Sequence, residues 1–272
     1  MYFQGSGVEV PLLIPPAVGF VVSFFTSMVG VSGAFLLLPF QMSVLGVVAP
    51  SVSATNLVFN LVATRGGLWR FSREGRVDWR LGLLVAGTAM PGLLAGWWLR
   101  SHWLLDPRTF RLFVGVVMLG LALRMLFMRG SHAATSATPA GPDNYRDGSI
   151  AAVSLVVGVI GGAYGIGGGA IMAPVLVAVF RLRVHAVAGA TLLATLLTSI
   201  AGVVAYTVLP TRAGVDMHPD WQLGLLFGLG GLGGMYAGAR AQKFVPQRPL
   251  ELGLAVVITA LAATYVAQYF LR

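Results

Sequence analysis

Long apolar stretches separated by short polar or basic ones dominate the pattern of this sequence. Several stretches approach the length of about twenty residues that an α-helix needs to cross the hydrocarbon core of a bilayer. Their apolar residues run continuously instead of alternating with polar ones, which favours helices over the strands of a membrane barrel. A helix also gives its backbone polar groups the internal partners that lipid does not supply. The pattern therefore predicts an all-α, polytopic integral membrane protein.

Apolar segments lie on both sides of one polar stretch, five in each half of the chain. The first two segments of each half are short, and only glycine-containing residues separate them, so each pair either crosses fully or forms a re-entrant hairpin. The predicted segments are residues 11–30, 33–48, 52–72, 80–99 and 108–128 in the first half, and 149–164, 168–180, 184–208, 221–240 and 249–271 in the second.

The polar stretch, residues 129–148, is rich in Ala, Ser, Thr, Pro and Gly, the composition of a flexible linker. It separates a first membrane repeat, residues 8–128, from a second, residues 149–272. Residues 1–7, "MYFQGSG", resemble the remnant of a protease-cleaved expression tag and are left out of the sequence argument.

The two halves resemble each other. "VGVSGAFLLLP" at residues 29–39 aligns with "YGIGGGAIMAP" at 164–174, an offset of 174 − 39 = 135, and the same offset pairs Phe71 with Tyr206. Further matches follow in the same order, which indicates a duplication. Because each half has an odd number of crossings, the second copy is predicted to be inverted, as in many secondary transporters.

Charge sets the predicted orientation. The chain carries 18 Lys+Arg against 9 Asp+Glu, and only 10% of its residues are charged. The loop "RGGLWRFSREGRVDWR" holds five arginines and is predicted to be cytoplasmic, whereas its counterpart "TRAGVDMHPD" holds one arginine and two aspartates and is predicted to lie outside. Arg100 and Arg108 are exceptions on the outer side. We therefore expect a multi-pass protein of the bacterial cytoplasmic (inner) membrane with both termini outside, and we assign the net charge of +9 to topology and not to nucleic-acid binding.

The glycine stretch "GGAYGIGGGAIMAP", residues 161–174, interrupts an apolar region. Glycine permits unusual backbone angles and close approach of a ligand, and a new helix follows, whose free N–H groups form an anion site. The alternative is that the glycines only allow tight helix packing. No Lys-Ser/Thr follows them, so the stretch is not a nucleotide loop. The candidate substrate-binding residues at the two interruptions are Ser32, Gly33, Ala34, Phe35, Gly167, Gly168, Gly169 and Ala170.

Polar residues in the third segment of each half extend this candidate site. Asn56 and Asn60 lie four residues apart on one helix face, and Thr191 and Thr195 repeat the spacing in the second half. Hydrogen bonding between helices is the alternative role for such groups. Residues that could line a pathway, or else serve in snorkelling or packing, are Thr55, Arg65, Tyr164 and Tyr206.

Other kinds of site find no support in the sequence. There is no cysteine, the four histidines are scattered through loops, and every acidic residue lies in or beside a loop. We therefore predict no metal site, no cofactor and no catalytic residue, and no carboxylate within the membrane to bind a coupling ion. The sequence therefore does not indicate an enzyme.

The motifs "GIGGGAIMAP", its weaker copy "GVSGAFLLLP" and the downstream "AGATLLATLLTS" resemble the sulfite exporter TauE/SafE family, also called the TSUP family of permeases. The resemblance covers nearly the whole chain after the first residues. It implies transport of small sulfur-containing anions, such as sulfite or organosulfonates, across the cytoplasmic membrane. The first-half motif departs from the family's triple glycine, since Ser32, Gly33 and Ala34 stand in its place.

The resulting hypothesis is a permease that exports such an anion, with the substrate and the lipid bilayer as its partners. Outward movement of a monoanion from a negative interior releases about 2.3 kcal/mol per 100 mV, so export needs no coupled ion. The alternatives are transport of another small anion such as a carboxylate, transport of a neutral solute, and a membrane scaffold without transport. The sequence indicates no particular oligomeric state.

Overall fold

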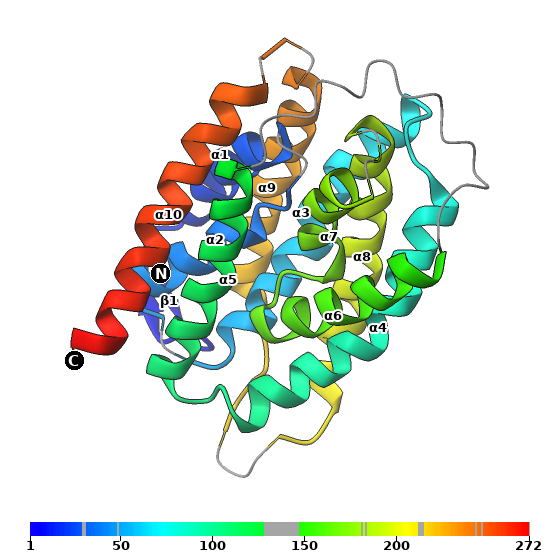
Figure 1. The fold of residues 1–272 in the computed structure, drawn as a ribbon. Helices are drawn as coiled ribbons and strands as arrows, with labels where there is room; N and C mark the ends of the chain where they lie inside the picture. The colour runs from blue at the N-terminus through cyan, green and yellow to red at the C-terminus, as the bar shows by residue number, and fades with distance from the viewer. Residues whose placement is uncertain are drawn as a thin grey trace.

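A computed structural model describes residues 1–28, 31–47, 49–127, 147–180, 182, 184–211, 215–242, 244–245 and 247–271. The predicted linker lies outside these residues except at its end, where Asp147 and Gly148 already belong to a helix. Within the described residues the chain forms a helical bundle and one small hairpin (Figure 1). The elements are β1 (Tyr2–Phe3), β2 (Val8–Glu9), α1 (Ile14–Met28), α2 (Ala34–Ser43), α3 (Val52–Arg73), α4 (Trp79–His102), α5 (Pro107–Phe127), α6 (Asp147–Tyr164), α7 (Gly168–Ala178), α8 (Val184–Val208), α9 (Trp221–Ala241) and α10 (Gln247–Leu271).

Each apolar segment predicted from the sequence corresponds to one of these helices, which confirms the all-α polytopic class. In the described residues four helices are long and apolar enough to cross a membrane: α4, α6, Val187–Val208 within α8, and Leu252–Phe270 within α10. At a rise of about 1.5 Å per residue, the 10 residues of α2 and the 11 of α7 cover roughly half of the hydrocarbon thickness of about 30 Å. Neither of these short helices can span the bilayer alone.

Glycine allows the main helix pairs to pack backbone against backbone. A Cβ atom on Gly234 of α9 would collide with the carbonyl oxygen of Phe20 on α1, and one on Gly92 of α4 would collide with that of Leu155 on α6. Small residues at such contacts are how membrane helices gain packing energy, since lipid gives no hydrophobic drive to associate. The pairs α1–α9 and α4–α6 are accordingly in extensive contact.

Helix α3 lies at the centre of the bundle. It packs against both α8 and α9, and its residues 52–60 are all buried. Helix α10 lies at the periphery beside α5, and only 22% of its apolar stretch Leu252–Phe270 is buried inside the protein. Side chains of α3 are therefore placed to contact segments of both halves, whereas α10 presents most of its surface outward.

The helix ends gather at two opposite faces. An ion pair of 3.0 Å between Arg80 and Asp147 places the start of α4 beside the start of α6. At the other face, Asp220 caps α9 by accepting from Leu223 N, and its own N–H donates to Thr55 Oγ1 at the start of α3. Figure 1 shows the α3–α4 and α9–α10 connections at one end of the bundle and the connection before α9 at the other.

The first residues form a two-stranded antiparallel hairpin, in which β1 pairs with β2. Phe3 is fully buried, Ser51 Oγ donates to Gly5 O at 3.2 Å, and Ser6 N donates to Asp220 Oδ2 at 3.0 Å. The stretch that resembles a tag remnant therefore packs against the segment before α3 and the start of α9.

Candidate functional site at two helix interruptions

The second interruption lies between α6 and α7 and depends on its glycines. Gly165 and Gly167 have φ angles of +83° and +74°, in the left-handed region that side chains other than glycine rarely adopt. A Cβ on Gly165 would also collide with Ser53 O of α3, and one on Gly169 would collide with Thr191 O of α8. Glycine is needed here because the backbone is both unusually bent and closely surrounded.

The first interruption, between α1 and α2, is built differently. Gly33 has helical angles, with φ of −57°, and residues 29 and 30 lie outside the described part. Ser32 satisfies the start of α2, because its Oγ accepts from Ala34 N at 3.3 Å and its carbonyl oxygen accepts from Phe35 N at 3.2 Å. The first-turn amides that would bind an anion at this end already have partners.

Two asparagines of α3 connect the interruptions. Asn56 Nδ2 donates to Ala34 O at 2.9 Å and to Gly165 O at 3.0 Å, so one side chain contacts both interruptions. Asn60 Nδ2 donates to Ile166 O at 2.9 Å, and Asn60 Oδ1 accepts from Ser32 Oγ at 2.6 Å. All of these side chains are buried. The structure thus brings the two predicted interruptions together at one level of α3, while the buried Asn56 Oδ1 has no hydrogen-bond partner among the described residues.

Tyrosine side chains add to the same junction. Tyr164 OH donates to Phe35 O at 3.0 Å, and the two rings stack with centroids 5.9 Å apart. Tyr206 OH donates to Gly162 O at 2.9 Å. Both tyrosines are fully or almost fully buried. They hold α6 against α2 and α8, which matches the packing role that the sequence left open for them.

Two of the predicted pathway residues lie away from the junction. Thr55 is at the start of α3, where its hydroxyl donates to Ser51 O and accepts from Asp220 N. Arg65 is exposed and lies further along the same helix, toward its basic end. The structure does not bring either residue to the interruptions.

The start of α7 has amide groups without partners. Gly168 N donates to Thr198 Oγ1 at 3.1 Å, but the N–H groups of Gly169 and Ala170 have no hydrogen-bond partner in the described part of the chain. Ser199 Oγ is buried beside Gly167, just before these amides, and also has no hydrogen-bond partner among the described residues. A Cβ built on Gly167 would lie 3.1 Å from both hydroxyl oxygens of Thr198 and Ser199.

The predicted threonines Thr191 and Thr195 lie on α8, and their hydroxyls donate to backbone carbonyls of α8 itself. Thr191 Oγ1 donates to Val187 O at 2.9 Å, and Thr195 Oγ1 donates to Thr191 O at 2.8 Å, both within α8. The Thr195 hydroxyl still lies beside the interruption, because a Cβ on Gly169 would be 2.5 Å from Thr195 Oγ1, and the hydroxyls of Thr198 and Ser199 lie beside Gly167. Thr198 was missed by sequence reasoning, although it lies three residues after Thr195 and so shares its helix face.

Arg100 is a buried cation next to this region. The sequence placed it in an outer connection, but it lies in the last turn of α4 with 1% of its surface exposed. Its Nε donates to Ser53 Oγ at 3.3 Å, Nη1 donates to Leu104 O, and the guanidinium lies 3.8 Å from the centroid of the Phe110 ring. Ser53 in turn donates to Ala163 O, just before the second interruption. No carboxylate among the described residues forms an ion pair with Arg100.

The titratable acids with shifted pKa values lie in connections, away from the junction. A hydrogen bond from Arg76 lowers the pKa of Glu74, and the Thr109 N–H lowers that of Asp106. The backbone N–H of His218 lowers the pKa of Asp216. Within the described residues no group of three or more His, Asp and Glu could hold a metal. Positive partial charge from helix ends, together with Arg100, therefore dominates the junction.

A bundle of apolar helices with two interrupted helices meeting inside it defines a polytopic membrane protein of the kind that binds solutes at discontinuous helices. The chain matches the family "Sulfite exporter TauE/SafE" over residues 16–265, and it belongs to this family. It is a membrane transporter of that family.

Curated relatives agree with this assignment. A "Probable membrane transporter protein" of Xylella fastidiosa (strain 9a5c) is 26% identical over 255 residues, covering 92% of this chain and 94% of that protein. The "Probable membrane transporter protein YunE" of Bacillus subtilis (strain 168) is 21% identical over 259 residues, covering 88% and 92%. No solved structure matches the chain.

Proposed function

We propose that this transporter exports small sulfur-containing anions, such as sulfite or an organosulfonate, across the bacterial cytoplasmic membrane. It acts as a permease and not as an enzyme, and the anion binds at the start of α7. One observation carries the proposal: at the start of α7 the N–H groups of Gly169 and Ala170, and the buried hydroxyl of Ser199 beside Gly167, have no hydrogen-bond partner in the part of the chain that the structure describes.

The chemistry of these groups favours an oxyanion. A helix N-terminus carries roughly half a positive charge and presents N–H groups that point at a ligand. A buried donor without a partner costs about 1–3 kcal/mol, so a ligand that accepts from it recovers that free energy. Sulfite and sulfonate groups each offer three oxygen acceptors, which suit two amides and one hydroxyl. No acidic residue in the described parts of the helix interiors opposes a negative charge.

The two interruptions take different roles in this proposal. Because Ser32 already satisfies the first turn of α2, we place the substrate at α7 and not equally at both helix starts. Asn56 and Asn60 hold the interruptions together in the arrangement described here, since their amide N–H groups donate to backbone carbonyls. Rocking of the halves against each other would exchange these bonds for contacts to the substrate.

An inverted arrangement of two repeats is supported by where the paired helices begin. Helix α3 begins at the face of Asp220, whereas α8, its counterpart, comes close to Arg76 and Val77 at Gly189, beside the α3–α4 connection. That connection is basic, so we assign its face to the cytoplasm and both termini to the outside. With the interior negative, the potential then favours outward movement of the anion.

Transport in reconstituted vesicles tests the proposal. We expect sulfite flux that competing sulfonates inhibit, that neutral solutes do not inhibit, and that an interior-negative potential accelerates outward. Ser199→Ala is expected to raise the KM for sulfite by about tenfold to a hundredfold, because one hydrogen bond to a charged group, about 1.5–3 kcal/mol, is lost. Thr207→Ala is the matched control, since its hydroxyl donates only within α8. Equal inhibition by neutral solutes, or an unchanged KM in Ser199→Ala, would contradict the site.

A further inference from the structure

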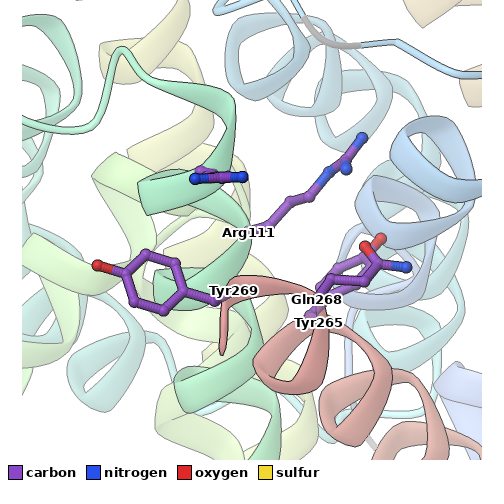
Figure 2. A pocket seen from close by; sticks show the side chains of 5 residues that line it. Arg111, Tyr265, Gln268 and Tyr269 are labelled. Carbon is purple, nitrogen blue, oxygen red and sulfur yellow. The ribbon is translucent and has the colours of Figure 1, made fainter. Parts of the chain in front are cut away.

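A cavity of about 160 Å³ opens between α5 and α10, at the end of the bundle where α5 begins and α10 ends. Its lining residues are Arg108, Arg111, Tyr265, Gln268 and Tyr269. Figure 2 shows the Arg111 side chain from one helix and those of Gln268 and Tyr269 from the other around the opening. It is separate from the helix interruptions and plays no part in the transport site proposed above.

The cavity concentrates positive charge, and Asp106 offsets part of the charge of Arg108. Arg108 and Arg111 are one turn apart at the start of α5, where the helix dipole disfavours cations. Asp106 is close, but its Oδ2 accepts from Thr109 N at 2.8 Å and from Thr109 Oγ1 at 2.9 Å. No ion pair among the described residues involves either arginine. An anion bound in this cavity would stabilise both guanidinium groups.

The surroundings of the cavity identify the source of that anion. Helix α10 faces outward: Val256 is 62% and Phe270 is 76% exposed, as expected for side chains in contact with lipid tails. Tyr269 lines the opening, and Trp103, at the end of α4 where α5 soon begins, is exposed too. Aromatic residues at helix ends mark the depth of the lipid headgroups. A cationic cavity between membrane helices at that depth fits a lipid phosphate.

We propose that this cavity binds the phosphate of a membrane phospholipid, with an anionic headgroup preferred, and that the bound lipid steadies α2. The link to α2 is Tyr265, whose hydroxyl contacts Ser43 Oγ at 2.6 Å and donates to Pro39 O at 3.1 Å. Since α2 follows the first interruption, occupancy of the cavity acts on the segment that Asn56 and Ser32 hold at the junction. The proposal does not depend on which solute is transported.

Lipid titration of the purified, delipidated full-length chain tests this site by native mass spectrometry. The probes are phosphatidylglycerol, phosphatidylcholine and diacylglycerol, with inorganic phosphate and sulfite as free competing anions. We expect phosphatidylglycerol to bind best, diacylglycerol not to bind, and Arg108→Ala/Arg111→Ala to weaken phosphatidylglycerol binding by about tenfold or more. The control Arg73→Ala/Arg240→Ala removes two exposed arginines at the opposite end and should change binding by less than about twofold.

Two further measurements separate lipid binding from loss of fold. A photoactivatable phosphatidylglycerol on the unaltered protein should label the start of α5 and the end of α10. Tyr265→Phe should still bind the lipid but lose the rise in melting temperature that the lipid produces in the unaltered protein. Labelling elsewhere, or equal weakening in the control variant, would overturn the proposal. If inorganic phosphate or sulfite displaced phosphatidylglycerol, the cavity would be a site for free anions and the lipid proposal would fail. If the unaltered protein were a dimer and Arg108→Ala/Arg111→Ala a monomer, the cavity would instead be an interface between copies of the chain.

Discussion

Replacing Asn56 tests whether one side chain holds the two interruptions together. In Asn56→Ala, Gly165 O loses the only hydrogen-bond partner that it has among the described residues, and Ala34 O loses a partner additional to those of its own helix. The change also removes Asn56 Oδ1, a buried acceptor for which the described part of the chain offers no donor. We therefore expect a net loss of stability, made smaller because the variant also removes the unsatisfied Asn56 Oδ1.

The magnitude follows from these three atoms. A buried carbonyl left unpaired costs about 1–3 kcal/mol, whereas single hydrogen bonds between membrane helices contribute about 0.6 kcal/mol on average. Adding the larger cost for Gly165 O and the smaller one for Ala34 O, and allowing for relief at Oδ1, gives a net loss of about 1–3 kcal/mol. For a chain of this size that corresponds to a fall in melting temperature of roughly 3–10 °C.

The assay is thermal unfolding in detergent, followed by the fluorescence of the chain's 6 tryptophans, together with sulfite flux in vesicles. Thr207→Ala is again the control and should shift the melting temperature by no more than about 1 °C, because its hydroxyl bonds only its own helix. Asn56→Asp is expected to destabilise more than Asn56→Ala, since a carboxylate there would face two carbonyl oxygens.

An Asn56→Ala variant as stable as the control would refute the reasoning, because Gly165 O cannot lose its partner in a buried site without consequence. Lower stability with unchanged flux would mean that Asn56 supports the fold but that the junction plays no part in transport.

Three further predictions concern other parts of the molecule. Gly165→Ala combines a φ of +83° with a collision at a neighbouring carbonyl, so we expect a loss of at least about 1–3 kcal/mol; normal expression and melting temperature would contradict it. Arg100→Lys keeps the charge, but a lysine ammonium cannot donate to both Ser53 Oγ and Leu104 O while stacking on Phe110 as the guanidinium does. The melting temperature should therefore fall. An unchanged melting temperature would show that the charge alone matters. The pKa of Asp106 is lowered, chiefly by the Thr109 N–H, so the ionised carboxylate stabilises the protein above its unfolded pKa, and this stabilisation is lost as pH falls through the folded pKa. Asp106→Asn should therefore reduce the change in melting temperature between about pH 5 and pH 3. A pH profile identical to that of the unaltered protein would count against this cap.

Much of the fold could be predicted because lipid restricts the choices. Continuous apolar runs of sufficient length must be helices, so their positions followed from hydropathy, and α3 and α8 begin at the predicted residues. The glycine stretch also indicated an interruption correctly, since three glycines in succession at residues 167–169 weaken a helix. The convergence of two interruptions was a prediction from the repeat that the contacts of Asn56 confirm.

The side-chain partners could not be predicted in the same way. A serine in place of glycine at Ser32 looked like a weaker copy of the motif, yet it satisfies the amides of α2 and makes the two interruptions chemically different. Arg100 looked like an outer loop residue, because charge alone does not reveal that Ser53 and Phe110 surround it. Arg108 stood out only as an exception to the charge rule, and its place in a cavity with Arg111 and residues of α10 could not be predicted, because α10 is distant in sequence.

By itself the sequence determined the helical membrane class and the family, because both depend on apolar run length or on local motifs that neighbours along the chain define, and it predicted a duplicated plan. Only the tertiary structure decided which amides at the interruptions remain without partners and which arginines lie together. The physical reason is that a polar group in a membrane protein is satisfied by whatever the packed bundle brings within about 3 Å of it, and segments more than a hundred residues apart meet there, as Asn56 and Gly165 do.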